Sequence, residues 1–181
     1  MTEPTVAAPA VETGHILVVD DSRMNRLALQ RSLEQQGHRV ALAEDGIQAL
    51  AELKTRPCDV VLLDIVMPGM DGYAVLSHMM ADTELRHIPV IVISAVDELD
   101  AVVRCIELGA EDYLPKPFNS VLLRARLNAS LRRKRLRDLE KAYLRQEVML
   151  RQSEKLATLG RLSAGMAHEL NNPIAAIQAS G

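Results

Sequence analysis

The stretch 15-HILVVDD-21 decides the fold, together with 60-VVLLD-64, which repeats its plan. In each stretch a short aliphatic run ends on acidic side chains. Runs that are apolar throughout are typical of strands in parallel sheets with helices on both faces. Open sheets of this kind bind ligands in the crevice at the carboxyl ends of their strands. We therefore expect Asp20, Asp21 and Asp64 to converge in one acidic pocket.

Short apolar runs alternate with amphipathic segments of helical length from His15 to about Phe118. Right-handed crossovers between such units predict an α/β, flavodoxin-like fold, a doubly wound five-stranded parallel sheet in the order 2-1-3-4-5. Gly37 and Gly109 stand where helices are expected to end. The predicted strands are Ile16–Asp20, Arg39–Ala43, Val60–Asp64, Pro89–Ser94 and Asp112–Leu114, and the predicted helices are Arg23–Gln36, Gly46–Thr55, Tyr73–Ala81 and Glu98–Leu108.

The composition restricts the class of protein. A chain of 181 residues has room for one domain and an appendage. Its net charge of −3 does not favour binding to nucleic acid. Cys58 and Cys105 lack metal-ligand spacing, so we interpret them as small buried or half-buried thiols of a reducing compartment. Residues 1–14 lack the features of a signal peptide and predict a disordered arm. Because no stretch is long enough to span a membrane, we expect a cytoplasmic protein without membrane contact.

Three carboxylates brought close together repel one another unless a cation neutralises them. Mg²⁺ binds through a few carboxylates, water and phosphate oxygens, so it suits such a pocket. Lys116 follows a further apolar run and supplies another positive charge beside it. These residues predict a magnesium site and phosphoryl chemistry on a carboxylate.

Five separate motifs, in order and at strand ends, resemble the receiver domain of two-component response regulators. They are Asp20-Asp21, Asp64 with 67-MPGMDG-72, Ser94-Ala95, Tyr113 and 116-KPF-118. The resemblance runs from about Gly14 to Leu131, and we expect a receiver domain over 15–131.

The resemblance implies a role for each of these positions. Asp64 is the phosphoacceptor, and Asp20, Asp21 and Asp64 hold Mg²⁺ together with the main-chain carbonyl of Val66. Lys116 and Ser94 bind the phosphoryl group, and the Lys116-Pro117 bond is cis. Ser94 and Tyr113 form a switch pair. A histidine kinase or phosphotransfer protein donates the phosphoryl group.

Haloacid-dehalogenase-like phosphatases also use Mg²⁺ and an aspartate on a parallel sheet. They place a second acid two positions after the nucleophile at the first strand end. This chain has Ser22 two positions after Asp20, which argues against that class.

After Phe118 the sequence changes character. From Asn119 to Asn172 there is no proline, which permits one helix of about fifty residues. The spacing of five residues predicts a coiled-coil seam over 132–155 and a parallel homodimer. A second set of residues keeps the same spacing but is out of phase with this seam. The alternative to a coiled coil is a single amphipathic helix folded back on the domain. The first set is Leu136, Leu139, Tyr143, Gln146 and Leu150, and the second is Leu159, Leu162, Met166 and Glu169.

The basic run 132-RRKRLR-137 is interpreted as the solvated face of that coiled coil. Nucleic-acid binding through it is disfavoured because no recognition helix is apparent.

Residues 168-HELNNP-173 resemble the phosphoacceptor motif, or H-box, on the dimerisation helix of sensor histidine kinases. The resemblance makes His168 a candidate phosphoacceptor and Glu169 the acceptor of its proton, within a partial dimerisation region over 156–181. The ATP-binding domain does not follow within the sequence. We therefore expect the N-terminal part of a receiver-first hybrid histidine kinase that is not an active kinase by itself.

Two functions fit these observations. In the first, phosphorylation of Asp64 controls a dimeric helical output that contains His168. In the second, the chain is a phosphorylation-dependent docking and dimerisation protein without kinase output.

Overall fold

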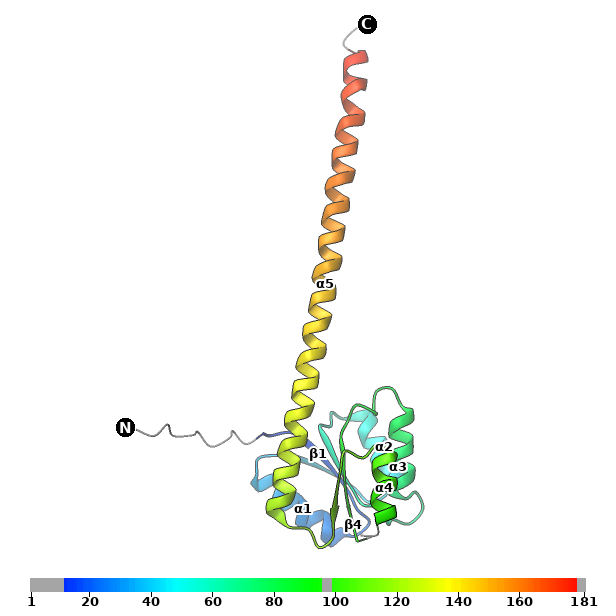
Figure 1. Ribbon diagram of the computed structural model, residues 1–181, viewed down its shortest axis with the longest axis vertical. Helices are drawn as coiled ribbons and strands as arrows, with labels where there is room; N and C mark the ends of the chain where they lie inside the picture. Colours follow the sequence, from blue (N-terminus) through cyan, green and yellow to red (C-terminus); the bar gives the residue numbers. More distant parts are fainter. Residues whose placement is uncertain (1–11, 96–98, 179–181) are drawn as a thin grey trace, which may run out of the picture. The chain divides into compact units, whose positions relative to one another are not determined.

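The computed structural model describes residues 12–95 and 99–178, with side chains described as far as Met166. Five parallel strands form one sheet in the order β2-β1-β3-β4-β5, which confirms the predicted fold. Helices flank this sheet in the first part of the chain (Figure 1). The strands are β1 His15–Val19, β2 Arg39–Ala43, β3 Val60–Leu63, β4 Val90–Ser94 and β5 Asp112–Pro115, and the helices are α1 Arg23–Gln35, α2 Gly46–Thr55, α3 Gly72–Ala81, α4 Leu99–Glu107 and α5 Ser120–Gln178.

The predicted strand ends were wrong by one residue at the two acidic positions. Strand β1 ends at Val19 and β3 at Leu63, so Asp20 and Asp64 lie just beyond them. Each aspartate accepts a hydrogen bond from the backbone N–H two residues later, Asp20 from Ser22 at 2.9 Å and Asp64 from Val66 at 3.3 Å. This local bond competes with strand pairing and turns the chain out of the sheet.

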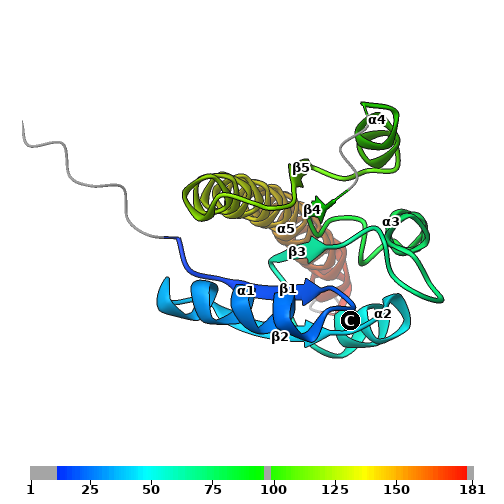
Figure 2. The ribbon, with the colours of Figure 1, turned by 90° about the horizontal axis from the view of Figure 1, so that it is seen from below.

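Helices cover both faces of the sheet. Helix α1 and the first turns of α5 pack on one face, and α2, α3 and α4 pack on the other (Figure 2). Alternate residues of β1 enter the two cores, with Leu17 and Val19 on one side and Ile16 and Val18 on the other. The central strands are therefore apolar throughout because both of their faces are buried.

Turns follow the sequence signals closely. Gly37 and Gly109 have φ angles of 88° and 98°, which favour glycine, and each follows a helix as predicted. The Lys116-Pro117 bond is cis, also as predicted. Residues 12–14 are the only part of the predicted N-terminal arm that the structure describes, and the predicted start of the fourth helix at Glu98 lies outside the described residues.

Helix α5 is tied to the sheet by its first four turns. Leu123, Leu127 and Leu131 are buried against the face that α1 also covers. Three members of the basic run then pair with acidic groups of the domain: Arg133 with Glu111 at 2.8 Å, Lys134 with Asp59 at 3.1 Å, and Arg135 with Glu12. These ion pairs give much of the basic run a role within the domain, whereas the sequence suggested only a solvated face.

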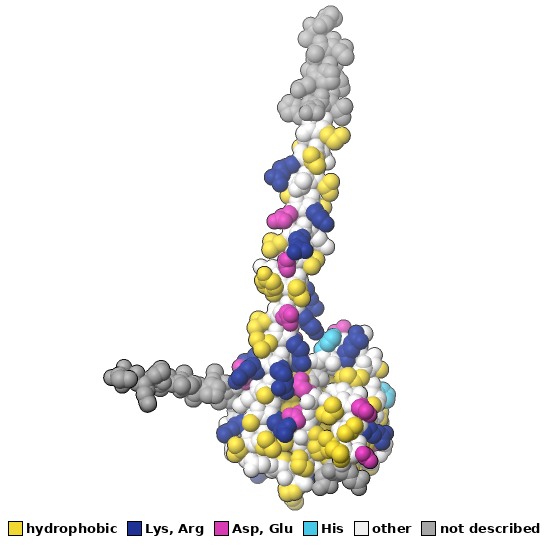
Figure 3. Space-filling model, viewed as in Figure 1, with side chains coloured by type: hydrophobic (Ala, Val, Ile, Leu, Met, Phe, Trp, Pro, Cys, Tyr) yellow, Lys and Arg dark blue, Asp and Glu magenta, His cyan; other side chains and the backbone are white. Residues whose placement is uncertain are grey.

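The first compact unit ends at Arg135, and the second begins at Leu136. Apolar side chains along this second unit are exposed, with Leu139 at 67% and Tyr143 at 68% (Figure 3). The coiled coil stays a prediction because the structure describes a single chain. Within the described residues, no helix is long and apolar enough to cross a membrane. His168 and Glu169 fall in α5, but their side chains lie outside the described part.

Both cysteines are free thiols. Burial raises the pKa of Cys58 to about 12 and also raises the pKa of Cys105. Since the thiolate is the reactive form, both side chains act as small apolar groups of the core.

His38 lies between α1 and β2, and its imidazole is buried without a hydrogen bond from the described residues. The residue is 4% exposed, and neither ring nitrogen has a hydrogen-bond partner among the described residues. Burial therefore lowers the pKa of His38 below 6.5. The unfolded chain binds this proton at higher pH than the folded chain does. The stability linked to His38 is present above pH 6.5 and is lost as the pH falls through the folded-state pKa.

We predict that a His38→Leu variant loses less stability on acidification than the parent chain. The reason is that the variant lacks the imidazole that binds a proton more readily in the unfolded chain. Urea unfolding at about pH 7 and about pH 5 measures the difference in stability loss. The matched control is His87→Leu, which removes an exposed histidine. Equal acid sensitivity of the parent and both variants would mean that His38 is not the linked group.

Candidate functional site

Asp20 is the most constrained acid of the site. The residue is 2% exposed, and its carboxylate accepts four hydrogen bonds. The amide Nδ2 of Asn25 donates to both oxygens at 3.2 Å, and the Ser22 N–H donates to Oδ1. The neighbouring Asp21 is exposed.

Asp64 lies beside it at the end of β3. Its backbone N–H donates to the Val19 carbonyl at 2.8 Å, which fixes the end of β3 against the end of β1. The residue is 6% exposed, so little of it reaches solvent. Gly72, the first residue of α3, packs on the backbone here, and a Cβ at this position would stand 2.4 Å from the Asp64 carbonyl oxygen. Helix α3 can approach the end of β3 this closely only because that residue is glycine.

Lys116 links the two buried acids. Its Nζ donates to Asp64 Oδ2 at 2.6 Å and to Asp20 Oδ2 at 2.7 Å. Burial acts to lower the pKa of Lys116, but the hydrogen bonds and negative charges of Asp20 and Asp64 outweigh it and raise the pKa above 10.5. The ammonium group is therefore charged at neutral pH and stands beside the Asp64 oxygen.

Ser94 and Tyr113 come from adjacent strands. Ser94 ends β4, is fully buried, and its carbonyl accepts the Lys116 N–H at 2.8 Å. Tyr113 on β5 pairs with Val92 of β4, and its hydroxyl oxygen is buried. Its ring packs against the core cluster under α2, α3 and α4. The two side chains thus lie on neighbouring strands, with Tyr113 in register two positions before Ser94, while their switching stays a prediction.

The acidic pocket fits a divalent cation. Carboxylate oxygens of Asp20, Asp21 and Asp64 lie within 4.8 Å of one another. Three carboxylates face one ammonium group, which leaves two negative charges for a cation to balance. Oxygen donors of this kind suit Mg²⁺. The backbone of Val66 stands beside Asp64, and the role of its carbonyl as a further ligand stays a prediction.

The sequence thus predicted the residues that meet in the pocket, namely Asp20, Asp21, Asp64 and Lys116, with Ser94 at the adjoining strand end. It missed Asn25 and Arg26, and it placed Gly72 in a motif without giving it a role of its own. The signal for Asn25 and Arg26 was their place in the first turn of α1, directly after the acidic pair. His168 and Glu169 cannot be placed at any site from the described side chains.

Comparison with known proteins agrees with this geometry. Residues 16–128 match the response regulator receiver domain family. The response regulator MprA of Mycobacterium ulcerans is 42% identical over 127 residues, which are 70% of this chain and 54% of MprA. The response regulator PleD of Caulobacter vibrioides is 38% identical over 152 residues, which are 82% of this chain and 34% of PleD. The chain therefore spans about half or less of these relatives.

Two solved structures extend the likeness to three dimensions. The receiver domain of the Francisella response regulator 1452 has a TM-score of 0.62 and 31% identity, covering 66% of this chain and 97% of that chain. The receiver domain of a signal transduction histidine kinase from Syntrophus aciditrophicus has a TM-score of 0.61 and 34% identity, covering 65% of this chain and 89% of that chain. The segment around His168 lies outside the family match.

Proposed function

The chain belongs to the response regulator receiver domain family, and from this premise we propose that Asp64 accepts a phosphoryl group and that α5 carries the resulting change to an output. Receiver domains receive phosphoryl groups from histidine kinases and typically bind Mg²⁺ at an acidic pocket. The observation that carries the proposal is the placement of Lys116 Nζ 2.6 Å from Asp64 Oδ2, within a pocket of three carboxylates.

In the proposed transfer an oxygen of Asp64 attacks the phosphorus atom of a phosphohistidine. The P–O bond to Asp64 forms as the P–N bond to the donor histidine breaks. The electron pair of the P–N bond stays on the ring nitrogen, which takes up a proton. The products are an aspartyl phosphate and a neutral histidine.

The residues of this chain stabilise the charge that gathers on the phosphoryl oxygens. Lys116 supplies an ammonium group beside the attacking oxygen. The Ser94 hydroxyl donates to a phosphoryl oxygen, and Asp20 and Asp21 hold Mg²⁺ together with Asp64. These three carboxylates would hold the cation, which would offset the repulsion that the Asp64 carboxylate exerts on an incoming phosphoryl group.

A donor with a P–N bond tests this function. Phosphoramidate contains the bond that breaks in phosphohistidine, so incubation with Mg²⁺ should add one phosphoryl group to the chain. Removal of Mg²⁺ with EDTA should reduce the adduct to background, as measured by intact mass. An unchanged adduct in EDTA would contradict the role of the acidic pocket.

We further propose that the whole protein is a receiver-first histidine kinase. The likeness to a receiver domain of a histidine kinase supports this proposal, as does the H-box motif at His168. In this arrangement His168 accepts a phosphoryl group when a kinase catalytic domain supplies it, and Glu169 accepts the proton of the ring. Transfer of label to His168 from a kinase domain added in trans would test it. Absence of any such transfer would favour docking and dimerisation without kinase output.

The exposed seam of the second unit supports a helical homodimer. Leu139 and Tyr143 repeat at coiled-coil spacing and are more than half exposed. Burial of such a seam by a second copy removes apolar surface from water. The basic run does not require nucleic acid, because three of its members pair within the domain.

We predict that Leu139→Asp weakens dimerisation by more than about tenfold, because a carboxylate at a seam position loses its hydration in the dimer. Sedimentation equilibrium of the full chain measures the effect. Val148→Asp is the control, since Val148 is exposed on the opposite side of the helix from the seam. A monomeric parent chain, or equal weakening by both variants, would contradict the predicted seam.

A further inference from the structure

The first turn of α1 holds the acidic pair from two directions. Asn25 holds the carboxylate of Asp20 through bonds from one amide nitrogen to both oxygens, each 3.2 Å long. Arg26 holds the backbone, because its Nη1 donates to the carbonyl of Asp20 at 2.7 Å and to that of Asp21 at 2.9 Å. Its Nη2 lies 3.5 Å from Glu44 Oε2, and its side chain is 12% exposed. The Asn25 bonds have a charged acceptor and the Arg26 bonds have a charged donor, so both sets are charge-assisted and restrict the acidic pair strongly.

The Arg26 contacts explain how two consecutive residues, Asp20 and Asp21, can bind the same ion. Successive side chains of an extended chain point to opposite faces, so Asp20 and Asp21 could not reach one ion from a continuing strand. The chain must turn between them. The guanidinium of Arg26 binds both carbonyls of that turn and therefore fixes it.

The carboxylate of Asp20 also needs a fixed orientation. Without Asn25, Oδ1 would keep only the Ser22 N–H and Oδ2 only the Lys116 ammonium among the bonds described. The amide of Asn25 bridges the two oxygens and opposes rotation of the carboxylate. Partners of metal-binding carboxylates that fix orientation in this way typically affect metal affinity by 10–100-fold.

We propose that Asn25 and Arg26 are positioning residues for the cation site, which set the side chain and the main chain of the acidic pair before Mg²⁺ binds. This inference rests on the proposed function, in which Asp20 and Asp21 hold the ion. The opposite possibility is that Asn25 competes with the ion for the lone pairs of Asp20. The two possibilities differ in sign, because a positioning residue raises Mg²⁺ affinity and a competitor lowers it.

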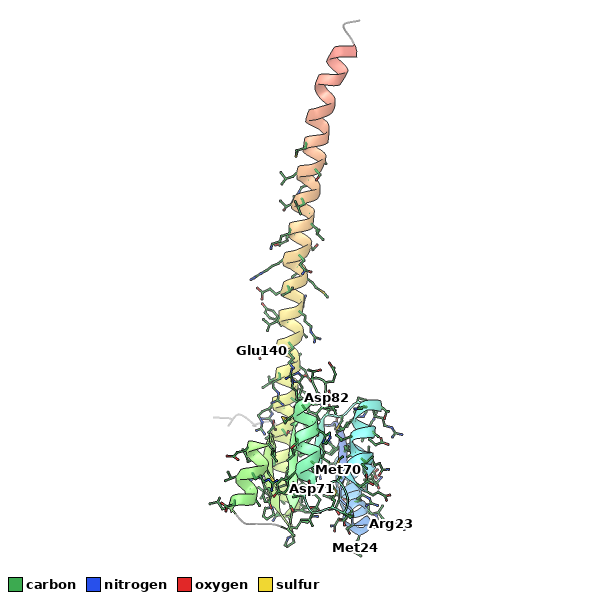
Figure 4. All side chains as sticks on the ribbon, turned by 90° about the vertical axis from the view of Figure 1, so that its right-hand side faces the viewer. Arg23, Met24, Met70, Asp71, Asp82 and Glu140 are labelled. Atoms are coloured by element: carbon green, nitrogen blue, oxygen red, sulfur yellow. The ribbon has the colours of Figure 1, made fainter. Side chains whose placement is uncertain are left out.

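The test is calorimetric titration of the full chain with MgCl₂. Asn25→Ala and Arg26→Gln should each raise the Mg²⁺ dissociation constant by about tenfold. Arg23→Gln is the matched control, because Arg23 is exposed on the same helix and its loss changes the net charge equally (Figure 4). Loss of positive charge alone should leave Mg²⁺ binding unchanged or slightly tighter. A weaker site in Arg26→Gln but not in Arg23→Gln therefore separates positioning from charge.

Arg26→Lys is a more conservative variant that keeps the test decisive if Arg26→Gln does not fold. It keeps the charge but lacks the planar fork that reaches two carbonyls, so binding should weaken by about threefold or more. Equal or tighter Mg²⁺ binding by the folded Asn25 and Arg26 variants would overturn the inference while leaving the metal site intact. Failure of the parent chain to bind Mg²⁺ would instead overturn the proposed cation site, and this inference with it.

Discussion

Replacing Asp64 by asparagine should abolish the phosphoryl adduct of about 80 Da that phosphoramidate or acetyl phosphate adds in the presence of Mg²⁺. The carboxamide has nearly the shape of the carboxylate and retains an oxygen for Lys116, which lies 2.6 Å from Oδ2 in the parent chain. It lacks the anionic oxygen that attacks phosphorus. Intact mass spectrometry measures the loss, and circular dichroism confirms that the variant is folded.

Asp100→Asn is the control for this experiment. It makes the same chemical change at an exposed position on α4, so its adduct should match that of the parent chain. Persistence of the adduct in Asp64→Asn would place the acceptor elsewhere and would remove the basis of the proposed function.

Replacing Lys116 by methionine should destabilise the Mg²⁺-free chain by about 3 kcal/mol near neutral pH, which for a domain of this size lowers Tm by roughly 10 °C. The substitution leaves the buried carboxylates of Asp20 and Asp64 facing each other without the ammonium group that now binds both. Addition of Mg²⁺ should restore part of the lost stability, because the ion neutralises the same charges. Thermal unfolding with and without MgCl₂ measures both effects.

Two comparisons isolate the cause of that loss. Lys54→Met removes an exposed lysine and should change Tm little. In the Lys116→Met background, Asp64→Asn should recover stability, since it removes one of the two repelling charges. A Lys116→Met chain as stable as the parent without Mg²⁺ would mean that the ammonium group does not hold the pocket together.

The site could be predicted because its chemistry is concentrated at strand ends. Asp20 and Asp64 follow runs that are apolar throughout, and the topology of a parallel sheet brings the carboxyl ends of β1 and β3 together. The predicted strand ends were wrong by one residue because of the same aspartates that form the site. Each aspartate bonds to its own backbone two residues later, and hydrophobic pattern alone does not report that bond.

Asn25, Arg26 and Gly72 were harder to predict because their roles depend on tertiary contacts. A polar residue in the first turn of a helix has many possible partners, and the sequence does not say that Asn25 and Arg26 turn toward Asp20. Gly72 could be recognised as part of a turn motif. Its close approach to the Asp64 carbonyl depends on how α3 meets β3.

The second unit shows a different limit of sequence analysis. Leu139 and Tyr143 have coiled-coil spacing, but a single chain leaves them exposed, so the pattern needs a partner to become a structure. For the basic run, the sequence predicted a solvated surface where the structure shows contacts within the domain. Lys134 suggested a solvated surface by composition, yet its partner Asp59 precedes it by more than seventy positions and only the fold brings them together.

The most direct test of the account is to identify the residue that carries the phosphoryl group in the parent chain. Borohydride reduces an aspartyl phosphate to homoserine and releases phosphate, so peptide mass mapping after reduction marks the acceptor. We predict homoserine at position 64, only in samples that received both Mg²⁺ and a phosphoryl donor. Homoserine at another aspartate, or an adduct that leaves position 64 unreduced, would contradict it.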